Sequence, residues 1–128
     1  MEVGGASCRI VVCDDQPDFR ELLSMVLTLE SGVEVVGEAA DGLEAIEAVR
    51  QHLPDLLLLD IAMPNMDGLE ALPHIRKASP GTKVVMVTAF GSESIRQRAL
   101  DAGAAGFLEK GMDVTDLVSE ITQICAAS

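Results

Sequence analysis

The chain has 128 residues, of which 48% are hydrophobic and 23% charged, a composition typical of one folded domain and not of a disordered segment. Its formal net charge of −12 argues against nucleic acid or anionic membranes as ligands of this domain, because both require clustered cations. Apolar runs stay far below the ~20 residues of a membrane helix, and the start of the chain lacks the pattern of a secretion signal. We therefore expect a cytoplasmic domain at residues 8–126, preceded by a disordered tail at residues 1–7.

Strand and helix patterns alternate five times along the chain. Short apolar runs predict strands, in chain order, at residues 8–13, 33–38, 55–60, 83–88 and 105–110. Amphipathic stripes predict a helix after each strand, beginning at or near Pro17, Asp41, Gly68, Ser92 and Asp113. Residues that do not continue a helix mark the expected ends of the first four, at Gly32, Pro54, Pro80 and Gly103.

This alternation predicts the α/β class. Strands separated by helices of about 10 to 15 residues indicate a doubly wound parallel sheet of five strands, with five helices distributed over both faces. The strands are almost uninterruptedly apolar, as expected where both faces of a sheet are covered. The four leucines at residues 56–59 make the third strand the most buried by pattern. Open sheets of this kind bind ligands outside the carboxyl ends of their strands.

Polar side chains occupy four of these carboxyl ends. Asp14 and Asp15 follow the first strand, Asp60 ends the third, Thr88 the fourth and Lys110 the fifth. Carboxylates brought this close repel one another, and a divalent cation that prefers oxygen ligands relieves the repulsion. We therefore predict a Mg²⁺ site at Asp14, Asp15 and Asp60, in which Mn²⁺ could substitute.

The same edge of the sheet is suited to a phosphoryl group. An aspartate beside a metal can attack phosphorus and form an acyl phosphate, and Asp60 precedes a turn that would present its carboxylate at the surface. Lys110 can pair with phosphoryl oxygens as a point charge, and the Thr88 hydroxyl can donate one hydrogen bond to them. Each residue alone is more often a helix cap, a surface charge or a strand residue, so the prediction depends on their joint occurrence.

The three cysteines are interpreted as reduced thiols. Without a secretion signal, a disulfide framework is not expected. Cys8 and Cys13 flank the first strand, and their spacing resembles no pair of metal ligands. Buried structural thiols are the expected state, because free cysteine is commonly buried.

The chain closely resembles the receiver domain of two-component response regulators over residues 9–124. The matching segments are VVCDDQPDFRELL, GEAADGLEAIEAV, PDLLLLDIAMPNMDGLEAL, VVMVTAF and AGAAGFLEKG. The resemblance implies a flavodoxin-like sheet with strand order 2-1-3-4-5. It also implies a signalling domain and not an enzyme, with at most self-phosphorylation and autodephosphorylation activity.

The resemblance implies roles for the acidic residues. Asp60 is expected to be the phosphoacceptor, and Asp14 and Asp15 the acidic pair. Asp15 would contact Mg²⁺ directly and Asp14 through water, while the backbone carbonyl of Ala62 would complete the protein ligands. A sensor histidine kinase or a phosphotransfer protein would donate the phosphoryl group from phosphohistidine. A phospho-dependent homodimer is a further candidate partner.

The resemblance also implies a conformational switch. Thr88 matches the switch hydroxyl, Phe107 the switch aromatic and Lys110 the family's lysine. Phosphorylation is expected to draw Thr88 toward the phosphoryl group and Phe107 into the space it leaves. The face formed by the fourth helix, the fifth strand and the fifth helix would then change shape.

The expected output is transcription through a DNA-binding domain that is not in this chain. Residues 37–43 and 60–72 look most like receivers attached to helix-turn-helix domains. The alternative is a stand-alone single-domain receiver that acts by protein–protein interaction.

Four positions differ from the family pattern or are expected to modify its behaviour. Gly111 follows the lysine where many receivers have proline, which would loosen the local backbone. Phe107 lacks the hydroxyl of the tyrosine often found there. Pro73 is expected to kink the third helix or to mark a late start. Phe90, which with Ala62 flanks the approach of an attacking water, is expected to slow hydrolysis of the acyl phosphate.

Two other functions are considered. A small magnesium phosphatase with an aspartyl nucleophile would need a second carboxylate as general acid and a cap over the substrate. Ala62 occupies the position two residues after Asp60, and no insertion is long enough for a cap. An interaction module that keeps the fold but is not phosphorylated is disfavoured by the complete acidic set with Thr88 and Lys110.

Overall fold

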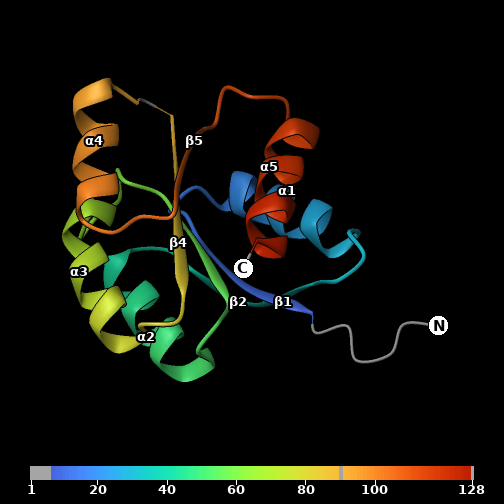
Figure 1. Cartoon of the computed structure of the whole chain (residues 1–128), viewed down its shortest axis with the longest axis horizontal. Helices are drawn as coiled ribbons and strands as arrows, with labels where there is room; N and C mark the ends of the chain where they lie inside the picture. The colour runs from blue at the N-terminus through green and yellow to red at the C-terminus, as the bar shows by residue number, and fades with distance from the viewer. Residues whose placement is uncertain (1–6, 90, 128) are drawn as a thin grey trace.

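The computed structural model describes residues 7–89 and 91–127. In chain order its elements are β1 (Cys8–Cys13), α1 (Pro17–Thr28), β2 (Val33–Ala39), α2 (Gly42–His52), β3 (Leu56–Leu59), α3 (Gly68–Ala78), β4 (Lys83–Thr88), α4 (Glu93–Asp101), β5 (Gly106–Glu109) and α5 (Val114–Ala126). The five strands are parallel and form one sheet in the order β2-β1-β3-β4-β5. Figure 1 shows α1 and α5 on one face and α2, α3 and α4 on the other. The predicted class and strand order are confirmed.

Short polar side chains begin four of the helices. Asp41, Asp67 and Ser92 each accept a hydrogen bond from the backbone N–H three residues later, at the starts of α2, α3 and α4. Asp113 does the same for the N–H of Thr115 at the start of α5. Helix α1 instead begins with a proline, whose missing N–H is not needed in a first turn. These local signals explain why the predicted starts agree with the observed ones.

Two helices contain features that the sequence pattern described less well. Pro73 lies inside α3, which already begins at Gly68, so the proline does not mark a late start. Leu53, the residue that follows α2, adopts the left-handed region with φ of 44°, a conformation usually left to glycine or asparagine. Pro54, which is buried, follows directly and prevents the helix from continuing.

Strand side chains alternate between two hydrophobic clusters, one under each helical layer. In β3, Leu57 and Leu59 pack toward α2, α3 and α4, whereas Leu56 and Leu58 pack toward α1 and α5. All four leucines are at most 1% exposed, which confirms β3 as the most buried strand expected from its sequence. A central strand buried on both faces gives the residue that follows it, Asp60, a rigid base.

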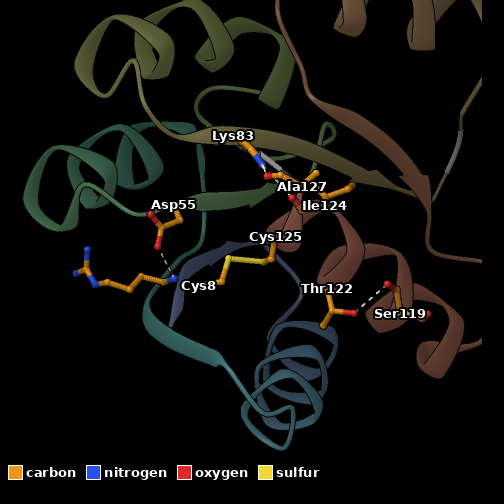
Figure 2. The surroundings of a disulfide bond; sticks show 9 residues. Cys8, Asp55, Lys83, Ser119, Thr122, Ile124, Cys125 and Ala127 are labelled. Carbon is orange, nitrogen blue, oxygen red and sulfur yellow. Dashed lines mark hydrogen bonds between the residues drawn. A yellow bond between two sulfur atoms is a disulfide. The ribbon is translucent and has the colours of Figure 1, made fainter. Parts of the chain in front are cut away.

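The cysteine prediction is wrong for two of the three thiols. Cys8 and Cys125 form a disulfide, with Cα atoms 5.9 Å apart although the two residues are 117 positions apart in sequence (Figure 2). The start of β1 and the end of α5 meet only in the folded chain, so spacing in the sequence carried no sign of the pair. Cys13 is a free and buried thiol, as predicted.

Two predictions concern residues that the structure does not describe. Residues 1–6 of the expected tail, and Phe90 with its expected effect on hydrolysis, lie outside the described residues. Among the helices that are described, none is both long and apolar enough to cross a membrane.

Candidate functional site

The predicted acidic residues meet at the carboxyl edge of the sheet. Strands β1 and β3 are neighbours, and their ends are joined by the Asp60 N–H, which donates to the Cys13 carbonyl at 3.1 Å. Asp14, Asp15 and Asp60 each offer a carboxylate oxygen, and the three oxygens lie within 4.8 Å of one another. Asp14 and Asp60 are buried and Asp15 is partly exposed. The edge is therefore a small acidic cup with one open side.

Lys110 bridges two of these carboxylates. Its Nζ lies 2.6 Å from Asp14 Oδ2 and 3.2 Å from Asp60 Oδ2, and its side chain is only 11% exposed. The backbone holds the lysine there, because the Lys110 N–H donates to the Thr88 carbonyl at 2.9 Å. The ammonium also lies 4.7 Å from the centre of the Phe19 ring, a cation–π distance. One cation just after β5 thus pairs with two anions that lie just after β1 and β3.

Burial and charge perturb the ionisation of this pair. Burial, with a further contribution from Asp14, raises the pKa of Asp60 to about 6, although Lys110 opposes the shift. Burial alone would lower the pKa of Lys110, but its contacts with Asp14 and Asp60 outweigh that effect and raise the pKa. Lys110 is therefore charged at neutral pH. Ionisation of Asp60 costs free energy, because the carboxyl is buried in a site already rich in negative charge.

The donor set fits a hard divalent cation. Within the described part of the chain, this grouping of possible metal donors contains only carboxylates, with oxygen as the ligand atom. Mg²⁺ and Mn²⁺ prefer such oxygen donors, whereas a zinc site would be richer in histidine and cysteine. A single ammonium leaves three carboxylates incompletely neutralised, so a second positive charge would relieve the site. Ala62, the expected carbonyl donor, lies in the exposed loop two residues beyond Asp60.

The loop after Asp60 is held closely against the strand end. The Ile61 N–H donates to Asp60 Oδ1 at 2.8 Å, and the Ile61 carbonyl accepts from the Gly68 N–H at 2.8 Å. A Cβ on Gly68 would lie 2.1 Å from the carbonyl oxygen of Asp60, a separation no side chain can tolerate. Gly68 is therefore required for the approach of α3 to the site, a role that the sequence analysis did not assign.

A second contact ties the same loop to the start of α2. Asn65 adopts a left-handed backbone, with φ of 66°, and its Nδ2 donates to Asp41 Oδ2 at 2.6 Å. Beside it the Gly42 N–H donates to the Met66 carbonyl at 3.0 Å. The backbone N–H of Glu44, followed by the Asn65 amide, lowers the pKa of Asp41. We call the hydrogen bond between Asp41 and Asn65 the loop latch.

From the sequence, Asp41 was predicted only to mark the start of a helix, and Asn65 was assigned no role. Asparagine is among the few residues that tolerate a positive φ, and this was the one local signal available. Arg20 was missed as well. Its Nη1 donates to the Asp14 carbonyl at 2.6 Å and its Nε pairs with Glu38 Oε1 at 3.0 Å, so it fixes the acidic pair to β2.

The predicted switch residues share one face of the sheet. Thr88 is the last residue of β4 and is buried, while Phe107 on β5 is partly buried. Met86 pairs with Phe107 and packs into the α2, α3 and α4 cluster, and Thr88 lies two residues further along the same face. The Phe107 ring also reaches the loop before α4, where a Cβ on Gly91 would come within 2.8 Å of it.

Comparison with known proteins identifies the family. The response regulator receiver domain family matches residues 10–122. The chain belongs to this family. It is therefore a phosphoacceptor signalling domain of two-component systems and not the phosphatase considered above.

Relatives of different length match this receiver domain. It is 43% identical over 113 residues to the probable transcriptional regulatory protein NarL of Mycobacterium tuberculosis, a match that covers 88% of this chain but 52% of NarL. The chain thus spans about half the length of that relative. It is 33% identical to the chemotaxis protein CheY of Thermotoga maritima, with 91% of this chain and 96% of CheY covered.

Solved structures agree with the fold. The receiver domain of M. tuberculosis NarL aligns with a TM-score of 0.89 and 40% identity, covering 96% of this chain and 99% of that one. The CheX–CheY–BeF3–Mg complex from Borrelia burgdorferi aligns with a TM-score of 0.87 and 28% identity, covering 95% of this chain and 92% of that one.

Proposed function

We propose that Asp60 accepts a phosphoryl group from the phosphohistidine of a sensor histidine kinase or phosphotransfer protein. The observation that carries this proposal is the position of Lys110, whose Nζ contacts the carboxylates of both Asp14 and Asp60. A carboxylate oxygen of Asp60 would attack phosphorus, the bond from phosphorus to the histidine nitrogen would break, and an acyl phosphate would form. Lys110 would follow the negative charge from the carboxylate to the phosphoryl oxygens.

The proposed reaction uses a divalent cation. Asp14, Asp15, Asp60 and the Ala62 carbonyl would hold Mg²⁺, with Mn²⁺ as a substitute. When bound, the ion would offset negative charge on the acidic edge and on the transferred group. The fit of the three carboxylates supports this assignment, as does the magnesium named with the related B. burgdorferi CheY. Asp60 must be ionised to attack, so the cation would also favour the reactive form of a carboxyl whose pKa is raised to about 6.

We also propose that phosphorylation is transmitted through Thr88 and Phe107. The Thr88 hydroxyl would donate to the phosphoryl group, and Phe107 would move into the space near it, changing the face formed by α4, β5 and α5. The shared face of Thr88 and Phe107 and the contact of Phe107 with Gly91 support this path. A shift of such a two-state equilibrium from 1:99 to 99:1 requires about 5.5 kcal/mol of preference for one state.

Phosphorylation can be tested without the kinase. The protein is incubated with acetyl phosphate and Mg²⁺, and its intact mass is measured with and without a chelator. We expect a gain of one phosphoryl group that needs Mg²⁺ and is absent in Asp60→Asn. Asp101→Asn, at an exposed position at the end of α4, is the matched control and should be phosphorylated normally. An equal gain in Asp60→Asn would place the acceptor elsewhere.

For the output, we propose control of transcription in the cytoplasm through an attached DNA-binding domain. The similarity to NarL, a probable transcriptional regulatory protein about twice as long as the matched region, supports this assignment. The alternative is a stand-alone receiver acting by protein–protein contact, which the near full-length match to CheY supports. The length of the encoding reading frame distinguishes the two. A shift in elution volume on phosphorylation would reveal the phospho-dependent homodimer.

A further inference from the structure

The disulfide lies at the end of the sheet opposite the acidic cup. Cys8 is the first residue of β1, whereas Asp14 follows its last residue, and Cys125 lies in the last turn of α5. We propose that Cys8 and Cys125 form a reversible thiol–disulfide site that is reduced by dithiols and reoxidised by disulfides. Its redox state controls how firmly the end of α5 is held to the sheet.

The bond is open to a reacting thiol. Both cysteines are partly exposed, and they line a hollow of about 530 Å³ between the start of β1 and the end of α5. Gly32 and Gly81 contribute to its walls, and a Cβ at either would meet no atom within 4 Å, so these walls leave room around the bond. Cys13 differs from Cys8 and Cys125 in burial and in reactivity. It is buried, and burial together with the charges of Asp14 and Asp60 raises its pKa, which makes it an inert internal control.

A positive charge is bound at the C-terminal end of α5, the helix that carries Cys125. Lys83 Nζ donates to the Ile124 carbonyl at 3.0 Å and to the Ala127 carbonyl, so it binds on both sides of Cys125 in the chain (Figure 2). The last turn of α5 contains no basic residue of its own. The partial negative charge at a helix C-terminus disfavours a thiolate, whereas a nearby ammonium favours one. Lys83 therefore assists the departure of sulfur as a thiolate during exchange.

The exchange balances with a dithiol as the reductant. One thiolate of the dithiol attacks a sulfur of the Cys8–Cys125 bond, which breaks as a mixed disulfide forms. The second thiol of the reductant then attacks the reductant's first sulfur in the mixed disulfide, and the protein sulfur leaves as a thiolate. Two electrons and two protons pass to Cys8 and Cys125, and the reductant leaves as an internal disulfide. Reoxidation is the reverse reaction with a disulfide of the same class.

Reduction removes the covalent tie at the end of α5. The covalent tie reaches β1, the Lys83 hydrogen bonds reach β4, and Ile124 packs over Gly106 of β5, where a Cβ would lie 3.0 Å from Ile124 Cδ1. After reduction this end is held by non-covalent contacts alone, among them the Lys83 hydrogen bonds and the packing of Ile124. Because α5 belongs to the proposed output face, redox state would also set the freedom of that face. This last consequence alone rests on the proposed function.

Thiol counting tests the bond. The full chain is treated with oxidised or reduced dithiothreitol under native conditions, unfolded in guanidinium with a maleimide, and weighed intact. We expect one labelled cysteine after oxidation and three after reduction. Cys13→Ser should give none and two, while Cys8→Ser should give two in both states. Three labels after oxidation, or a bond that dithiothreitol reduces only when the protein is unfolded, would overturn the proposal.

Two further measurements test the consequence for α5. Reduction should lower the melting temperature of the wild type and of Cys13→Ser by roughly 10 °C, as for loss of a disulfide closing a long loop, and should leave Cys8→Ser unchanged. Amide exchange at residues 119–126 should rise on reduction more than exchange in α3. Equal melting temperatures in both redox states, or a uniform rise in exchange, would refute control of α5. None of these readouts depends on phosphorylation, so they stand or fail apart from the role of Asp60.

Discussion

The two ends of the strands are stabilised by different interactions. We call the end with the acidic residues the carboxyl edge and the end with the disulfide the amino edge. At the carboxyl edge, three carboxylates lie close together and two of them share one ammonium, while the N-termini of the helices add partial positive charge nearby. At the amino edge, Arg9 donates to the His52 carbonyl at 2.8 Å, Lys83 donates to the Ile124 carbonyl at 3.0 Å, and the disulfide joins β1 to α5. The side chains of Arg9 and Lys83 thus donate hydrogen bonds to backbone carbonyls at the C-terminal ends of α2 and α5. The amino edge is therefore built for stability, and the carboxyl edge keeps unbalanced charge that a cation and a phosphoryl group can use.

The largest effect on the carboxyl edge is expected from Gly68→Ala. The new Cβ would lie 2.1 Å from the Asp60 carbonyl oxygen, so α3 or the strand end must move. We expect a loss of about 3 kcal/mol or more in the free energy of unfolding. Gly81→Ala at the amino edge is the control, because its Cβ would meet nothing within 4 Å. Urea denaturation measures the stability of both variants. Equal stabilities would show that the loop after Asp60 can move to accept the new Cβ at little cost.

Lys110→Met should abolish the bridge between Asp14 and Asp60 while keeping a side chain of similar length. Removing a preorganised charge from a phosphoryl-transfer site typically slows the reaction by about 100-fold. The measurement is the rate of acyl phosphate formation with acetyl phosphate and saturating Mg²⁺. Lys77→Met, on the exposed side of α3, should react at the wild-type rate. A rate for Lys110→Met equal to that of the control would mean that Lys110 serves only the fold.

The raised pKa of Asp60 predicts a dependence of stability on pH in metal-free protein. Between about pH 4 and pH 6 the folded state keeps a proton that the unfolded state releases, so this carboxyl makes stability fall as pH rises through that window. In Asp60→Asn the contribution disappears, and the variant should exceed the wild type by about 2 kcal/mol at neutral pH. Denaturation in chelator from pH 4 to pH 8 measures the difference. A constant difference across this range would contradict the shift.

A smaller effect is expected at the loop latch. Asn65→Gly keeps the positive φ but removes the hydrogen bond to Asp41, so it isolates that bond from backbone strain. We expect a loss of about 1 kcal/mol in stability. Mg²⁺ affinity, measured by calorimetry, should weaken several-fold because the loop carrying Ala62 is less fixed. If stability falls while Mg²⁺ affinity stays the same, the latch supports the fold and not the proposed metal site.

Much of the molecule was predictable from local patterns. The helix starts predicted at Asp41, Ser92 and Asp113 agree with the structure because a helix start depends on residues only two or three positions apart. The meeting of Asp14, Asp60 and Lys110 was also predictable. Parallel strands joined by helices bring their carboxyl ends to one edge, so topology converts three distant positions into neighbours.

Other contacts had no signal in the sequence. Whether Cys8 meets Cys125 depends on how far α5 extends beyond the sheet edge and how it rotates over β1, and periodicity specifies neither. The latch between Asp41 and Asn65 likewise depends on the distance between two loops, and Arg20 reaches Asp14 only through the packing of α1. The sequence by itself determined the order of strands and helices and the chemistry of the acidic edge, because both follow from short-range periodicity and chain direction. Tertiary structure alone decided which loops and helix ends touch, because those contacts depend on side-chain packing between elements far apart in the chain.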